Sequence, residues 1–198
     1  NAAIELEDRA GNVATGVREV ALPVSEPPPL AIVEVLANPA GPEPAQEFVE
    51  LLDVRAAGSP RTIAGLRIVD RPWSEVAAAI AEGDLPGAAI PSFSSEPGQR
   101  TVIVGDRYAL GDPGDPDPPA GAVVVTLDGS IGAGGLSNGG EPLMIYDPQS
   151  AALVASYATP LAGDGQGRSA INDHPGACDI AGAWRPHPLG ASSPGWSP

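Results

Sequence analysis

The sequence contains no lysine, and arginine alone supplies its basic charge. The 198 residues include 10 Lys and Arg against 25 Asp and Glu, which gives a formal net charge of −15. A nucleic-acid partner needs a basic face that neutralises phosphates, so nucleic acid is excluded as an expected partner. An anionic membrane surface is disfavoured for the same reason. Such a charge favours cationic partners, including metal ions.

Cysteine and long apolar runs are also scarce. Cys178 is the one cysteine, so no disulfide forms within these residues, and pairing with another part of the protein stays open. The longest apolar runs, such as residues 122–127, are far shorter than the ~18–20 residues that a membrane-spanning helix needs. We therefore predict no insertion into a membrane.

Glycine and proline, in contrast, are abundant, with 25 and 24 copies. They are scattered between short segments of Val, Ile and Leu, as turns are between strands. This pattern predicts an all-β fold with one short helix at about 74–82, capped by Ser74 and followed by Gly83. The predicted strands span residues 30–36, 47–53, 65–69, 100–104, 122–127, 142–146 and 154–158.

Two segments precede this main domain. Residues 1–24 alternate as a β-hairpin, with a turn at 8–12 and a second strand that carries Val20, Leu22 and Val24. The hairpin resembles the last hairpin of a bacterial immunoglobulin-like module, so we expect a truncated upstream module and further upstream domains in the full-length chain. Residues 25–29, Ser-Glu-Pro-Pro-Pro, predict a semi-rigid linker. The main domain then covers residues 30–198.

Several short motifs in the main domain occur in a recognisable order. They are Ile-Val-Glu-Val-Leu-Ala-Asn-Pro at 32–39, Glu-Phe-Val-Glu-Leu at 47–51, Ile-Ala-Gly-Leu-Arg-Ile-Val-Asp at 63–70, the Gly-turn-strand at 98–104, Leu-Ser-Asn-Gly-Gly-Glu at 136–141, Gly-Gln-Gly-Arg-Ser at 165–169 and Ser-Pro-Gly at 193–195. Together they resemble the bacterial branch of the lamin tail domain family. Two departures are a helix-bearing stretch at 72–95 and a long acidic loop at 106–119. The resemblance implies an immunoglobulin-like β-sandwich that serves binding or display.

The acidic loop is the most distinctive polar cluster. Asp112, Asp115 and Asp117 alternate with glycine and proline, and Asp106 lies just before them. Calcium takes six to eight oxygen ligands from turning loops of this kind, so these four residues are candidate calcium ligands. The loop lacks the EF-hand spacing, and a plain solvated loop is the alternative interpretation. No other cofactor is indicated.

Other candidates for chemistry are less specific. His174, Cys178 and His187 are conceivable zinc ligands or parts of a cysteine-dependent site, but their spacing is not diagnostic. Glu47 and Glu50 lie three apart in a predicted strand, so their side chains point to opposite faces and do not form a hydrolytic pair. Trp184 is a candidate binding residue for a carbohydrate or peptide. The alternative is that Trp184 and Trp196 seal the domain.

These observations predict a non-enzymatic binding or display module of a bacterial envelope or extracellular protein. Its expected partner is a protein or a cell-envelope polymer. Two alternatives stay open. One is an accessory or catalytic domain of a hydrolase that acts on an envelope polymer, which requires Asp106, Asp112, Asp117 and a histidine to meet in one cleft. The other is a structural spacer domain.

Overall fold

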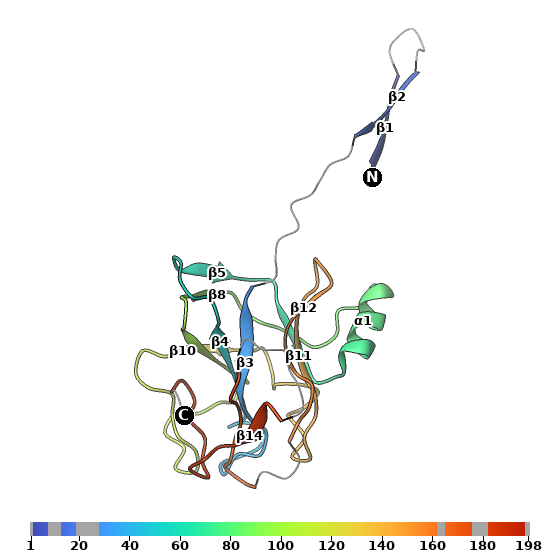
Figure 1. Cartoon of the computed structure of the whole chain (residues 1–198). Coiled ribbons are helices and arrows are strands. Elements are labelled where there is room, and N and C mark those ends of the chain that lie inside the picture. The colour runs from blue at the N-terminus through green and yellow to red at the C-terminus, as the bar shows by residue number, and fades with distance from the viewer. Residues whose placement is uncertain (1, 8–12, 19–27, 162–164, 176–181, 197–198) are drawn as a thin grey trace.

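The computed structural model describes residues 2–7, 13–18, 28–161, 165–175 and 182–196, without the side chains of the first two segments. Its elements are β1 (Ala2–Glu7), β2 (Val13–Arg18), β3 (Leu30–Leu36), β4 (Phe48–Asp53), β5 (Arg61–Ile63), β6 (Arg67–Val69), α1 (Trp73–Ala81), β7 (Ala88–Ala89), β8 (Phe93–Ser95), β9 (Arg100–Val104), β10 (Val123–Thr126), β11 (Leu143–Asp147), β12 (Ala152–Tyr157), β13 (Ala170–Asn172) and β14 (Trp184–Pro186). The fold is mostly β with one short helix, as expected (Figure 1).

Two larger sheets make up most of the main domain. One has six strands in the order β10-β9-β4-β3-β13-β14, and the other has four in the order β12-β11-β6-β7. All neighbours are antiparallel except β9 and β10, which run parallel. A parallel pair cannot be joined by a tight turn, so the chain between β9 and β10 takes a long crossover that contains the acidic loop.

The two sheets share one hydrophobic core. Alternate residues of β3, β4 and β9 meet alternate residues of β6, β11 and β12 there, since successive side chains of a strand point to opposite faces. Representative members are Ile32, Leu51, Ile103, Ile68 and Ile145, each at most 1% exposed. The spacing of apolar residues within the strands therefore places one core between the sheets.

The outer face of each sheet is covered as well. On the four-stranded sheet, α1 packs Val76 against Val69, Met144 and Tyr146, so the helix lies beside β11 (Figure 1). The outer face of the six-stranded sheet carries a smaller apolar cluster. It also carries two buried glutamates, Glu34 and Glu50, which the C-terminal segment covers. Among the described residues, no helix has the length and apolar character required to cross a bilayer.

Several predicted elements need correction. The structure places a second strand of the N-terminal hairpin at Val13–Arg18, with Val13 opposite Glu7, whereas the predicted second strand carries Val20, Leu22 and Val24. Residues 19–24 lie outside the described residues. Ser74 does not cap the helix: Pro72 occupies the N-cap and makes no side-chain cap bond, while Gly83 follows the helix with a φ of 92° as expected.

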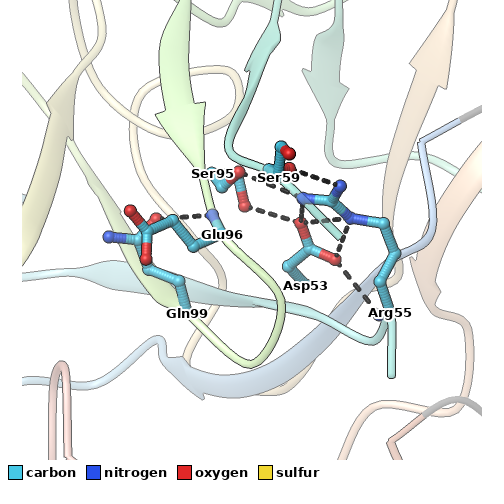
Figure 2. Close-up of polar contacts among 6 residues, drawn as sticks. All are labelled: Asp53, Arg55, Ser59, Ser95, Glu96 and Gln99. Atoms are coloured by element: carbon cyan, nitrogen blue, oxygen red, sulfur yellow. Dashed lines mark hydrogen bonds and ion pairs between the residues drawn. The ribbon is translucent and has the colours of Figure 1, made fainter. Parts of the chain in front are cut away.

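A buried carboxylate connects β4 to the small β5–β8 sheet. Asp53, at the end of β4, is 1% exposed and accepts hydrogen bonds from the backbone N–H and guanidinium of Arg55 and from Ser95 Oγ at 2.7–3.1 Å (Figure 2). Arg55 also donates to the backbone oxygens of Ser59 and Ser95, both at 3.1 Å. Burial acts to raise the pKa of Asp53, but the hydrogen bonds and charge of these partners outweigh it and lower that pKa.

We expect Asp53→Asn to lower the free energy of unfolding by about 1–3 kcal/mol at neutral pH, because the mutation removes the charged acceptor of several hydrogen bonds. The folded-state pKa of Asp53 lies below its unfolded value, so its stabilising contribution is present above about pH 4 and is lost as the pH falls through the folded pKa. Urea unfolding of both proteins across this range measures the effect.

Glu96→Gln is the matched control for this measurement. Glu96 lies in the neighbouring turn with an exposed side chain. Its backbone N–H donates to Gln99 Oε1 (Figure 2), and its carbonyl accepts the Gln99 N–H. We expect the control to change stability by no more than about 0.5 kcal/mol. Equal effects of the two substitutions would contradict a role for the Asp53 network.

Candidate functional site

A glycine-rich loop between β10 and β11 faces four carboxylates. Glu47 directly precedes β4, Asp70 directly follows β6, and Glu141 comes two residues before β11. Glu43 lies in the connection between β3 and β4. Strand ends from both larger sheets therefore place acidic side chains around one loop, which spans residues 131–140 and is called the glycine loop below.

Each carboxylate accepts a hydrogen bond from the glycine loop. Asp70 accepts from the backbone N–H of Ala133, Glu47 from that of Leu136 and Glu141 from that of Ser137, each at 2.8 Å. In addition, the Asn138 side-chain amide donates to Glu43 at 2.9 Å. A loop without regular secondary structure has few partners for its backbone donors, and the carboxylates supply them.

Two of the glycines are required by close contacts. Gly132 and Gly135 have φ values of 70° and 117°, which favour glycine. A Cβ on Gly132 would lie 2.6 Å from Asp70 Oδ2, and one on Gly135 would lie 2.6 Å from Pro44 Cβ and 3.0 Å from Glu47 Oε1. The loop reaches the carboxylates only because these positions lack side chains.

Burial and crowding alter the acidity of the cluster. Burial raises the pKa of Glu47 to about 8; the Leu136 N–H opposes this shift, and the charges of Glu43 and Glu141 add to it. The pKa of Glu141 is also raised, first by burial and then by Asp70, against the effect of the Ser137 N–H. Glu47 therefore holds a proton at neutral pH.

The carboxylates line an open pocket of about 410 Å³, whose remaining wall is Pro44 and residues 133–137. We call it the acidic pocket. Leu136, Ser137 and Glu141 also border a second pocket, which includes Asn38, Tyr157 and Arg168. The acidic pocket suits a cationic or hydrogen-bond-donating group, because four carboxyl groups line it beside the Ser137 hydroxyl.

A second polar cluster lies on the outer face of the six-stranded sheet. Glu34 of β3 and Glu50 of β4 are cross-strand partners, and both are 0% exposed. Glu34 accepts from Ser169 Oγ, Ser193 N–H and Ser193 Oγ at 2.6–2.7 Å. Glu50 is bonded to Arg100 of β9 and to the Gly195 N–H. The C-terminal segment thus covers two adjacent carboxylates.

The pKa of Glu50 lies close to neutral pH. Burial raises its pKa to about 7, although the Arg100 guanidinium and the Gly195 N–H favour the charged form; the neighbouring Glu34 adds to the increase. The proton that Glu50 binds in the folded state therefore relieves repulsion within the buried pair.

The predicted calcium ligands do not converge. Asp115 accepts the N–H groups of Ala40 and Gly41 at 3.0 and 2.7 Å, Asp117 accepts the Gly111 N–H at 2.9 Å, and Asp112 Oδ1 accepts the Gly114 N–H at 2.8 Å. These carboxylates brace their own loop and the neighbouring turn. Asp106 lines a different pocket, with Arg107 and Ser130.

The negative charge of the acidic loop affects the pKa of the neighbouring Tyr108. Burial raises the pKa of Tyr108 to about 12, and Asp117, Asp115 and Asp112 add to that shift. Within the described part of the chain, no group of three or more His, Cys, Asp or Glu side chains is placed to hold a metal ion. The calcium assignment therefore stays a prediction from sequence.

The other candidate residues are separated or buried. Cys178 and Asp179 lie outside the described residues. His187 is 2% exposed; its Nδ1 accepts the Leu189 N–H at 3.3 Å, and its Nε2 has no hydrogen-bond partner. His174 lies in a turn after β13, where its N–H bonds to Asn172. Among the described residues, no hydrogen bond joins either histidine to the acidic loop, and the hydrolase alternative stays a prediction.

Trp184 belongs to the core. It is 4% exposed, and its ring lies 4.4 Å from that of Tyr157 between centroids. In this position it seals the domain and presents no exposed ring for a ligand. Trp196, in contrast, is 56% exposed, so the expectation that it also seals the domain is wrong.

Sequence reasoning missed both carboxylate clusters. Glu47 and Glu50 were correctly separated by strand alternation, since Glu47 faces the acidic pocket and Glu50 faces the C-terminal segment. The pairing of Glu34 with Glu50 depends on strand register, which a single sequence does not specify. The available signal was an acidic residue inside each of two apolar strands and a glycine-rich loop flanked by strand-end carboxylates.

Comparisons with known proteins give no assignment: no family model matches the chain, and neither the curated proteins nor the solved structures contain a match.

We expect Glu47→Gln to increase the free energy of unfolding at pH 9 by roughly 1–2 kcal/mol, after allowance for solvent screening in the open pocket. The folded pKa of Glu47 is raised from 4.5 to about 8, so its favourable contribution is present below pH 4.5 and is lost as the pH rises through 8. Glutamine keeps an acceptor for Leu136. Urea unfolding at pH 5 and pH 9 measures the change, and a variant that tracks Glu96→Gln at both values would refute it.

We expect Arg100→Met to cost about 3–5 kcal/mol at pH 9, where it leaves ionised Glu50 buried without its cation. At pH 5, Glu50 is protonated and the loss falls to about 1 kcal/mol. Arg107→Met, at an exposed position, is the control for removal of an arginine. A cost that does not depend on pH would show that Glu50 does not titrate as proposed.

Proposed function

We propose that this chain is a non-enzymatic binding module of a bacterial envelope or extracellular protein, with an immunoglobulin-like fold similar to the lamin tail domain. The shared core between two larger sheets and the order of the sequence motifs support the fold assignment. The acidic pocket is the observation that carries the binding role.

The chemistry of the pocket defines its ligand. Glu43 is exposed at its rim, Glu141 is half-buried, and Glu47 is 2% exposed at its base. An arginine or lysine side chain of a partner protein would meet charged carboxylates at the rim and a protonated carboxyl at the base. Each rim pair is exposed and contributes about 0.2–1 kcal/mol, so we expect weak, salt-dependent binding.

Binding of a synthetic peptide of alternating Arg and Gly, measured by isothermal titration calorimetry at low ionic strength, tests this role. The variant Glu43→Gln/Glu141→Gln keeps acceptors for Asn138 and Ser137 but removes two charges. We expect it to weaken binding by about three- to tenfold, as two exposed ion pairs are lost.

The control variant Glu75→Gln/Glu96→Gln has the same net charge, because it neutralises two exposed carboxylates in α1 and in the turn before β9. Equal weakening in both variants would mean non-specific attraction to a chain of charge −15 and would overturn the assignment of the pocket. Absence of peptide binding would overturn the binding role and favour a spacer domain.

A further inference from the structure

The turn at the tip of the glycine loop contains a reactive pair of residues. Ser137 and Gly140 close a turn through a 2.9 Å hydrogen bond between the Gly140 N–H and the Ser137 carbonyl, with Asn138 and Gly139 at its centre. Both central residues are exposed to solvent. Of the five asparagines in the chain, Asn138 is the one followed by glycine.

We propose that Asn138 is a site of spontaneous deamidation, in which the backbone nitrogen of Gly139 is the nucleophile. The nitrogen loses its proton to base and attacks Cγ of the Asn138 side chain. A new C–N bond closes a five-membered succinimide ring, the bond from Cγ to the amide nitrogen breaks, and ammonia leaves. Water then opens the ring at either carbonyl and yields aspartate or isoaspartate.

The local structure leaves this nitrogen accessible. Within the described residues the Gly139 N–H makes no backbone–backbone hydrogen bond, and the bond that it donates to the exposed Ser137 Oγ is long, at 3.3 Å. Glycine has no Cβ to obstruct the approach of the nitrogen to the preceding side chain. The attack therefore needs rotation of exposed groups in a turn, without the opening of a strand.

The other described asparagines lack this arrangement. Asn172 lies in β13, and the nitrogen that follows it, in Asp173, donates to the Ala183 carbonyl at 3.0 Å. Attack at Asn172 requires that this bond be broken first. Asn38 precedes Pro39, whose nitrogen carries no hydrogen. The folded protein thus contains its own controls.

The reaction changes a contact of Glu43, which lines the acidic pocket. Asn138 donates to Glu43 at 2.9 Å through the amide nitrogen that leaves as ammonia. The product is a carboxylate, so a hydrogen-bonded pair becomes a pair of like charges. In the isoaspartate product the backbone gains an additional carbon, which alters the turn closed by Gly140. We infer that deamidation releases the tip of the glycine loop from Glu43.

Incubation of the folded protein at mildly alkaline pH, followed by peptide mapping, tests the proposal. Deamidation adds about 1 Da to the modified peptide. We expect the rate at Asn138 to exceed that at Asn172 by at least about tenfold, which corresponds to a modest local opening cost at β13. The rate at Asn138 should rise with pH, since the attack needs the deprotonated nitrogen.

Gly139→Ala is the decisive variant. Gly139 does not have a positive φ, and an added Cβ would lie 3.5 Å from Ser137 Oγ, an ordinary contact, so the turn tolerates alanine. We expect this variant to lose most of the reaction at Asn138 while its circular dichroism spectrum stays unchanged. Equal rates at Asn138 and Asn172, or an undiminished rate in Gly139→Ala, would overturn the proposal.

The structural consequence has a separate readout. Asn138→Asp reproduces the charge of the product, and we expect it to lower Tm by about 2–4 °C through repulsion from Glu43. Combination with Glu43→Gln, which removes one of the two charges, should restore most of that loss. A destabilisation that Glu43→Gln does not relieve would show that the contact with Glu43 is not what the reaction breaks.

Discussion

The packing of the six-stranded sheet depends on the hydrogen-bond donors that surround two buried carboxylates. Glu34 and Glu50 are paired across β3 and β4 on a face that water does not reach. An ionised carboxyl without partners in such a place is very unfavourable, so the sheet is stable only while Arg100, Ser169 and the C-terminal segment supply hydrogen bonds. The layer above the sheet is therefore fixed by polar contacts as much as by apolar ones.

The same use of acidic residues recurs elsewhere in the molecule. Asp53 organises the link from β4 to the small sheet, Asp115 holds the turn at Ala40 and Gly41, and Asp70 holds the glycine loop. The chain has no lysine, and in its described part the carboxylates accept from backbone N–H groups more often than from cationic side chains. The acidic residues thus stabilise loops and turns through hydrogen bonds, in addition to the effect of their charge on solubility and partners.

The sequence was sufficient to predict the elements with strong local patterns. In the main domain, β3 and β9 have the predicted bounds, and the other predicted strands differ by at most two residues at either end. The missed strands β5, β7, β8, β13 and β14 have two or three residues each. Segments this short have no periodicity of their own and become strands through pairing with distant partners.

The candidate site was less accessible from sequence for a related reason. Asp112, Asp115 and Asp117 were predicted as calcium ligands because they lie close together in sequence. In the structure they bond to different backbone groups. The acidic pocket unites Glu43, Glu47, Asp70 and Glu141 from three separate segments. Their convergence depends on tertiary structure, and local composition does not report it.

The position of β3 in its sheet has a consequence for the order of folding events. One edge of β3 pairs with β4, which follows it closely, but the other edge pairs with β13, and Glu34 bonds to Ser193 at a sequence separation of 159 residues. Closing so long a loop carries a large entropic cost before any contact rewards it. During synthesis, the nascent chain must hold the uncovered edge of β3 and its acidic face in water until β13 and Ser193 have left the ribosome. The negative charge that is buried in the finished domain then keeps this unfinished sheet from pairing with other chains.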